Sequence, residues 1–259
     1  MSHRLARFAF AATLSVGCLA AFASAASATY HENLIREIHK GNGTNGDYVE
    51  LQAYSAGQNL VAGKHIVVYD GGGGSTPFSD YTIPSNVGNA ANQATILISN
   101  GGVTGADFTA GSMTGEGNLN IVNTGSTVCY TDSSITVKLD CVAFQGTMNP
   151  VTVPSGANFG TPFALPGNDL NNQTLVRTIS RGCPTALDPA DDTNGASDFT
   201  LGTGNPRGNP TTPTETVCPP APPASPSTGT AKKKCKKKKK HKRSAESAKK
   251  KKCKKKKRH

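Results

Sequence analysis

The chain has 259 residues, a formal net charge of +11 and only 6% aromatic residues, with 28 Gly and no Trp. This composition is typical of short strands joined by many turns and does not suit a helical bundle. The charge is unevenly distributed, because residues 231–259 contain 17 Lys and 2 Arg but a single Glu, a net charge of +18. Residues 29–230 therefore carry a net charge of −9, so the acidic body and the basic tail need separate explanations.

Residues 1–28 have the pattern of a secretory signal peptide. Basic residues precede an uncharged apolar run over residues 8–22, and small-x-small triplets end at Ala25 and at Ala28. We expect cleavage after Ala28, with Ala25 as the alternative, and a mature protein that is secreted or held at the cell surface. An uncleaved anchor helix is a further alternative, although the run is short for a membrane span. A lipoprotein attached through Cys18 is another, although the Leu that usually precedes such a Cys is missing.

Short runs of strand-forming residues, each bounded by turn residues, recur along the body. In residues 47–54 the apolar side chains alternate strictly with polar ones, a period of two that predicts a half-buried β-strand. Residues 94–99 are expected to form a central strand, and residues 132–134 to form the turn of a hairpin. The other expected strands cover residues 34–39, 64–69, 126–130, 135–144, 174–179 and 198–201. We therefore predict an all-β fold, an antiparallel β-sandwich over residues 29–210.

The six cysteines that follow the leader are expected to be in an oxidising compartment, where an even number favours disulfides. They contain no C-x-x-C pair, which argues against a zinc or thioredoxin-like site. Two body pairs are favoured among the many possible connectivities. One joins Cys129 to Cys141 across the expected hairpin, and the other joins Cys183 to Cys218, tying the late loop to the chain that leaves the domain.

Four short motifs resemble those of one known family. Residues 46–51 read G-D-Y-V-E-L, residues 60–63 read L-V-A-G, residues 139–144 read L-D-C-V-A-F, and residues 197–209 run from S-D-F-T to N-P-R-G-N. In this order they resemble the lamin tail domain, which occurs in nuclear lamins and in exported bacterial proteins. The resemblance covers about residues 33–210 and implies an immunoglobulin-like β-sandwich. The family's strand Trp is absent, since Lys64 and His65 stand there, and the loops over residues 71–93 and 145–172 are long.

No residue set in the body amounts to an active site, so we expect neither an enzyme nor a cofactor. Asp47 and Glu50 are close carboxylates, the residue types of a glycosidase acid–base pair. At a spacing of three they lie on opposite faces of a strand, so we expect Asp47 to cap a turn and Glu50 to pair with a neighbouring strand. The glycine run over residues 71–75 lacks the Lys of a phosphate-binding loop. The body histidines lack zinc spacing and are expected to be ordinary surface or strand residues: His31, His39 and His65.

Residues 188–198 contain four carboxylates in a predicted loop. Crowded oxygen ligands suit Ca2+. The segment departs from the calcium-loop pattern, because Asp191 and Asp192 are adjacent and no Glu closes the loop. We expect a solvated turn before the last strand, with a calcium site as the alternative.

Residues 211–230 are rich in Pro and Thr and are expected to form an extended linker. Residues 231–259 follow as two lysine blocks, one around Cys235 and one around Cys253. Like charges at this density repel one another, so we expect a disordered tail. The two cysteines lie among cations that favour thiol exchange, and the hypothesis for them is that they cross-link chains or loop the tail.

Such a tail predicts a polyanionic partner. For an exported protein we expect an anionic cell-wall polymer or membrane surface, with extracellular DNA as the second candidate and a merely solubilising tail as the alternative. No small-molecule substrate is identified. The expected polyanion-binding residues are Lys232, Lys233, Lys234, Lys236, Lys237, Lys238, Lys239, Lys240, Lys242, Arg243, Lys249, Lys250, Lys251, Lys252, Lys254, Lys255, Lys256, Lys257 and Arg258.

These features predict an exported, non-catalytic binding or structural module, a β-sandwich retained on anionic cell-envelope polymers by its polycationic tail. One alternative is an extracellular nucleic-acid-binding protein that uses the same tail. The other is an accessory domain protein of a secreted hydrolase or nuclease system, although the chain offers no catalytic half of its own.

Overall fold

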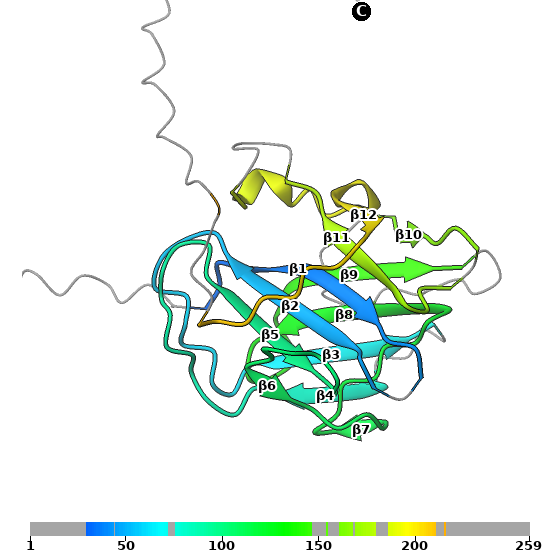
Figure 1. Cartoon of the computed structure of the whole chain (residues 1–259), viewed down its shortest axis with the longest axis horizontal. Helices are drawn as coiled ribbons and strands as arrows, with labels where there is room; N and C mark the ends of the chain where they lie inside the picture. Colours follow the sequence, from blue (N-terminus) through cyan, green and yellow to red (C-terminus); the bar gives the residue numbers. More distant parts are fainter. Residues whose placement is uncertain are drawn as a thin grey trace, which may run out of the picture. The chain divides into compact units, whose positions relative to one another are not determined.

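A computed structural model of the chain describes residues 30–43, 45–71, 76–146, 154, 161–167, 169–179, 186–210 and 215. Over these residues the protein is all-β, with two stacked sheets and no α-helix (Figure 1). The predicted β-sandwich is therefore confirmed. Most strand pairs are antiparallel, and the parallel pairs are short ones near the sheet edges, β5 with β6, β4 with β7 and β9 with β10.

The first sheet has the order β12-β11-β1-β2-β5-β6. The predicted strand over residues 94–99 has neighbours on both sides, because the short β6 lies outside it. A bulge in β1 between Ile35 and Glu37 shifts its register against β2. The strands are β1 (Asn33–Lys40), β2 (Tyr48–Ala53), β5 (Thr95–Ser99), β6 (Phe108–Thr109), β11 (Gln173–Arg177) and β12 (Phe199–Gly202).

The second sheet has the order β10-β9-β8-β3-β4-β7. Its centre is the predicted hairpin of β8 and β9 together with β3, which pairs with β8. The strands are β3 (His65–Asp70), β4 (Ser79–Thr82), β7 (Gly115–Glu116), β8 (Gly125–Thr131), β9 (Lys138–Gln145) and β10 (Phe163–Ala164). Two short 3-10 turns precede β12, η2 (Pro189–Asp191) and η3 (Ala196–Asp198).

The main core lies between the two sheets. Alternate residues of each strand point into it, and large aliphatic and aromatic side chains fill it. Burying each such side chain contributes roughly 1.5–3 kcal/mol, which is the main force that holds the sheets together. Core residues without measurable exposure include Ile35, Ile38, Val49, Leu51, Ile66, Val68, Val128, Tyr130 and Phe144.

The hairpin contains the predicted disulfide. Cys129 and Cys141 are opposite each other in the register of β8 and β9, and the bond between them joins residues whose Cα atoms are 4.1 Å apart. Both are buried in a small apolar cluster separate from the main core. The second expected pair, Cys183 and Cys218, lies outside the described residues.

The predicted half-buried character of residues 47–54 is wrong. All six residues of β2 are buried, including the polar ones on its outer face. The cover comes from residues 203–210, which follow β12 and are hydrogen bonded across that face of the first sheet (Figure 1). We call residues 203–210 the strap.

Candidate functional site

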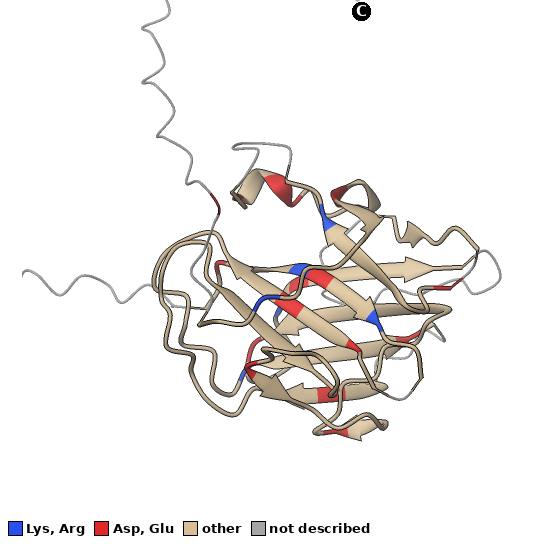
Figure 2. Cartoon of the chain, in the orientation of Figure 1, with Lys and Arg blue, Asp and Glu red and all other residues tan. Residues whose placement is uncertain are grey.

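The lysines and arginines of the tail, and the leader and most of the linker, lie outside the described residues. The predicted polyanion-binding set therefore remains a prediction. Among the described residues no helix is long and apolar enough to cross a membrane. The structure does place the charged residues of the body, and Figure 2 shows acidic residues, in red, spread over its strands and turns.

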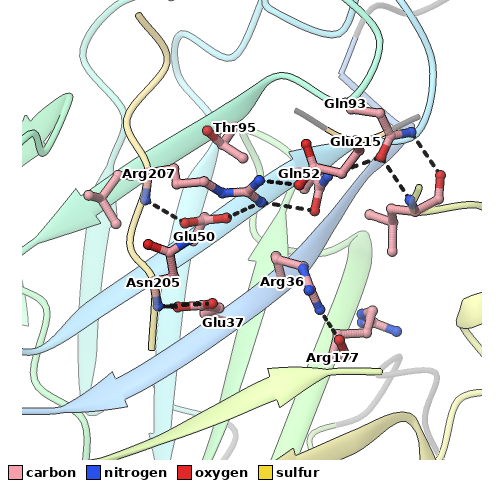
Figure 3. Close-up of polar contacts among 12 residues, drawn as sticks. Arg36, Glu37, Glu50, Gln52, Gln93, Thr95, Arg177, Asn205, Arg207 and Glu215 are labelled. Atoms are coloured by element: carbon pink, nitrogen blue, oxygen red, sulfur yellow. Dashed lines mark hydrogen bonds and ion pairs between the residues drawn. The ribbon is translucent and has the colours of Figure 1, made fainter. Parts of the chain in front are cut away.

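The strap is held by carboxylates on the outer face of the first sheet. In an extended chain alternate N–H groups point the same way. Every second residue of the strap uses its N–H group to donate to a different carboxylate, two of which are labelled in Figure 3. The pairs are Asn205 N with Glu37 Oε2 at 3.0 Å, Arg207 N with Glu50 Oε2 at 2.7 Å, and Asn209 N with Asp107 Oδ2 at 2.8 Å.

Glu50 is the central carboxylate of this set. It is fully buried, and its second oxygen accepts from Arg207 Nη2 at 3.0 Å. Burial raises the pKa of Glu50 to about 7, the Arg207 guanidinium opposes this shift, and the neighbouring Glu37 adds to it. Glu50 was expected to pair with a neighbouring strand. Its partner is instead Arg207 of the strap, which also forms an ion pair with Glu215.

Glu37 and Tyr48 join β1 to β2 beneath the strap. The Tyr48 hydroxyl donates to Glu37 Oε2 at 2.8 Å, and burial raises the pKa of Tyr48 further above its ordinary value. The His39 ring stacks on Tyr48 with centroids 5.0 Å apart, and its Nδ1 lies 2.9 Å from Thr174 Oγ1. Burial lowers the pKa of His39, so its imidazole is neutral at neutral pH.

Asp47 has the capping role predicted for it. Its carboxylate accepts from the N–H groups of Gly41 at 3.0 Å and Ile121 at 2.9 Å, and it forms an ion pair with Lys40 at 3.0 Å. These partners are different from those of Glu50. The two carboxylates are therefore framework groups with separate environments, as expected, and do not form an acid–base pair.

The acidic segment over residues 188–198 is only in part the solvated turn expected, because two of its four carboxylates are buried. Asp191 and Asp198 are buried, and their side chains accept from backbone N–H groups within the segment. The segment also faces Arg177, whose Nη1 lies 3.4 Å from Asp192 Oδ1 and 4.0 Å from Asp198 Oδ2. Regarding the calcium alternative, the described residues hold no group of three or more His, Cys, Asp or Glu side chains placed to bind a metal ion.

Arg177 is the cation that sequence reasoning missed. Its side chain is only 1% exposed and lies between the sheets, where Nη2 is 2.6 Å from Asp140 Oδ2 on β9. The pair also serves the bulge in β1, because Ile35 N donates to Asp140 and Arg177 Nε donates to Ile35 O. The ion pair therefore joins the two sheets at the position where the ladder of β1 is interrupted.

The other histidines are strand or surface residues, as predicted. His65 on β3 contacts Asp80 on β4, with Nδ1 2.7 Å from Oδ1. The ring of His31 stacks on Tyr30 at a centroid distance of 4.1 Å.

A groove on the outer face of the first sheet is the second feature that the sequence did not reveal. Its volume is about 370 Å³. Three separate segments form it, the paired ends of β1 and β2, the start of β11, and the chain from the end of β12 into the strap. The lining residues are His39, Tyr48, Asn172, Gln173, Thr174, Gly202, Thr203, Gly204 and Pro206.

Comparisons with known proteins add no assignment. No family model matches the chain, and no curated protein matches it. The resemblance to the lamin tail domain therefore rests on the four motifs alone and stays a prediction.

Proposed function

We propose that this protein is an exported, non-catalytic binding module, a β-sandwich held on anionic polymers of the cell envelope by its polycationic tail. The observation that carries the proposal is the inward orientation of the body's acids. Seven carboxylates are buried and used inside the body: Glu37, Asp47, Glu50, Asp80, Asp140, Asp191 and Asp198.

The remaining acids of the body are too few to neutralise the tail. The chain has 17 acidic residues, of which Glu246 belongs to the tail and seven are buried, so nine are left on the body. The tail carries a net charge of +18. Even complete pairing within the chain would leave a large excess of lysine, which favours an external polyanion.

The envelope is favoured over a specific partner because the lysine blocks have no pattern beyond charge density. Each Lys near an anionic surface contributes roughly 1 kcal/mol, so many together bind firmly without shape recognition. Such binding weakens steeply as the salt concentration rises, because added salt reduces the gain from counterion release and screens the attraction.

The test compares the mature chain with two variants, one ending at Thr230 and one in which every tail Lys is Gln at unchanged length. Fractionation of the native host into wall, membrane and medium should find the mature chain with the envelope and both variants in the medium. Envelope retention of the Lys→Gln variant would show that charge is not what holds the protein, and the proposal would fail.

Extracellular DNA is the second candidate, since the same tail charge suits it. Three of the body's arginines, Arg36, Arg177 and Arg207, are held in contacts within the body, so DNA contact would depend on the tail. Binding of the mature chain to purified anionic wall polymer and to duplex DNA, compared across a salt series, separates the two. Tighter binding to DNA at every salt concentration would replace the envelope with nucleic acid as the target.

A further inference from the structure

We propose that the groove on the outer face of the first sheet is a binding site for an uncharged, hydroxyl-rich ligand, one or two sugar units of a neutral glycan. This site is separate from the tail and its proposed anionic target.

The size of the groove fits a small ligand. Binding pockets for small molecules have volumes of about 300–1,000 Å³, and this groove has about 370 Å³. A hollow beside Arg177 has a volume of about 10 Å³, which is enough for a single water molecule at most. The groove therefore has room for a sugar, which the hollow beside Arg177 does not.

The lining carries no formal charge. None of the nine lining residues is Asp, Glu, Lys or Arg. His39 is neutral at neutral pH, since burial lowers its pKa more than the nearby Asp47 raises it. The Glu37 carboxylate, next to Tyr48, accepts from the Tyr48 hydroxyl and from Asn205 N. This environment favours a neutral ligand over a phosphate, a carboxylate or a metal ion.

Two exposed polar side chains of the groove lining are unused. Asn172 and Thr203 are exposed, and within the described part of the chain neither side chain has a hydrogen-bond partner. The Asn172 amide offers both donor and acceptor, and the Thr203 hydroxyl does the same. The half-buried ring of His39, which stacks on the buried Tyr48, and the half-buried Pro206 supply apolar surface in the same lining. Alternating polar and apolar contacts of this kind match a sugar ring, which has hydroxyl edges and C–H faces.

The walls are fixed before any ligand arrives. A Cβ atom at position 204 would lie 2.0 Å from Tyr48 Oη and 2.7 Å from Thr174 Oγ1, so only glycine lets the strap approach this closely. Asn172 adopts a left-handed backbone with φ of 55°, and its N–H group donates to Lys40 O at 2.7 Å. A rigid site loses less conformational freedom on binding, which favours even a weak ligand.

The experiment uses the mature full-length chain labelled with 15N, titrated with N,N′-diacetylchitobiose and, separately, with cellobiose. Amide signals of Gln173, Thr203 and Gly204 should shift with at least one of the two, with a Kd on the order of 1 mM, equivalent to about 4 kcal/mol. Glucose 6-phosphate and glucuronate, which carry charge, should shift these signals less at equal concentration.

A rim variant, Asn172→Gly with Thr203→Val, tests the assignment without disturbing the core, because both side chains are exposed and glycine tolerates the left-handed backbone of position 172. It should keep the parent's amide spectrum elsewhere and bind the disaccharide at least tenfold more weakly. Met113→Ala, which changes a side chain 73% exposed outside the groove, is the matched control and should bind like the parent. Unchanged affinity in the rim variant, absence of groove shifts with both disaccharides, or stronger shifts with the charged sugars would each overturn the proposal.

Discussion

Two buried clusters of charge hold this protein together, and they are placed differently. Arg177 lies between the sheets with its side chain 1% exposed, and its closest partner, Asp140, is 2% exposed. Arg207 lies over the outer face of the first sheet, with its side chain 17% exposed and its partner Glu50 fully buried. The first cluster joins the two sheets, whereas the second holds the strap against one of them.

The difference has an energetic consequence. An ion pair taken fully out of water is costly, and removing one partner leaves the other charge buried without compensation. That penalty is largest at Arg177, because both members of its pair with Asp140 are almost completely shielded from solvent. The strap cluster is closer to water and lies near the end of the described body, so when the protein is destabilised the strap should detach before the sandwich unfolds.

Arg177→Met should produce the largest effect. The change leaves the Asp140 carboxylate buried without its cation and removes the donor to Ile35 O, so unfolding free energy should fall by about 3–5 kcal/mol. Urea denaturation followed by circular dichroism measures the loss. Lys64→Met, which removes a cation over the Tyr30 ring, is the control and should cost less than about 1 kcal/mol. Equal losses in the two variants would mean that the interior pair does not join the sheets as described.

The second prediction concerns Glu50 and pH. Its pKa is about 7 in the folded protein and near 4.5 when unfolded, so the folded state binds the extra proton between these values. The stabilisation that Glu50 contributes to the folded state is therefore complete below its unfolded pKa, and it is lost as the pH rises through 7. The lost amount is on the order of 3 kcal/mol at most, because a tenfold difference in proton affinity between the two states corresponds to about 1.4 kcal/mol.

Glu50→Gln removes this titration while keeping an oxygen that accepts from Arg207 N. Its stability should depend less on pH than that of the parent between about pH 5 and 8, as measured by urea denaturation across a pH series. Glu116→Gln, the same chemical change at an exposed carboxylate on β7, is the control and should follow the parent. A variant whose stability falls with pH as steeply as the parent's would show that Glu50 does not carry the effect.

The two clusters also differ in how far the sequence anticipates them. The alternation in β9 places Asp140 on the same face as Val142 and Phe144, and in β11 it places Arg177 on the same face as Leu175. The alternation of the sequence therefore already places both charged side chains on the faces of β9 and β11 that point into the core. The pattern alone does not predict their burial, because a charged residue on a core face is rarely buried unless it is paired.

The position of the strap over the sheet could not be predicted from the alternation of apolar and polar residues. Residues 203–210 contain no alternation, and their contacts to Glu50 cross more than 150 positions of sequence. The half-buried interpretation of β2 failed because it considered one strand without the segment that covers it. The short β6, β7 and β10 escaped prediction for a related reason, since two residues are too few to show a period. The long β-branched runs, by contrast, predicted their strands and the hairpin disulfide correctly.

Gly204→Ala should produce the smallest effect and test directly whether the strap is separable. The added Cβ would meet Tyr48 Oη at 2.0 Å, so the strap must move away and lengthen the bond from Asn205 N to Glu37. Crowding of this kind costs about 1–3 kcal/mol. Because the clash lies outside the main core, hydrogen exchange should accelerate at the amides of Asn205 and Arg207 and remain unchanged in β8 and β9.

Gly202→Ala is the matched control for this variant. A Cβ at position 202 would lie 3.5 Å from Val176 Cγ2, an ordinary contact, so exchange at the strap should match that of the parent. If Gly204→Ala instead accelerated exchange in β8 and β9 as much as in the strap, the strap and the sandwich would open as one cooperative unit. The outer cluster would then be part of the same structural core as Arg177, and the distinction between a cluster that joins the sheets and one that holds a strap would fail.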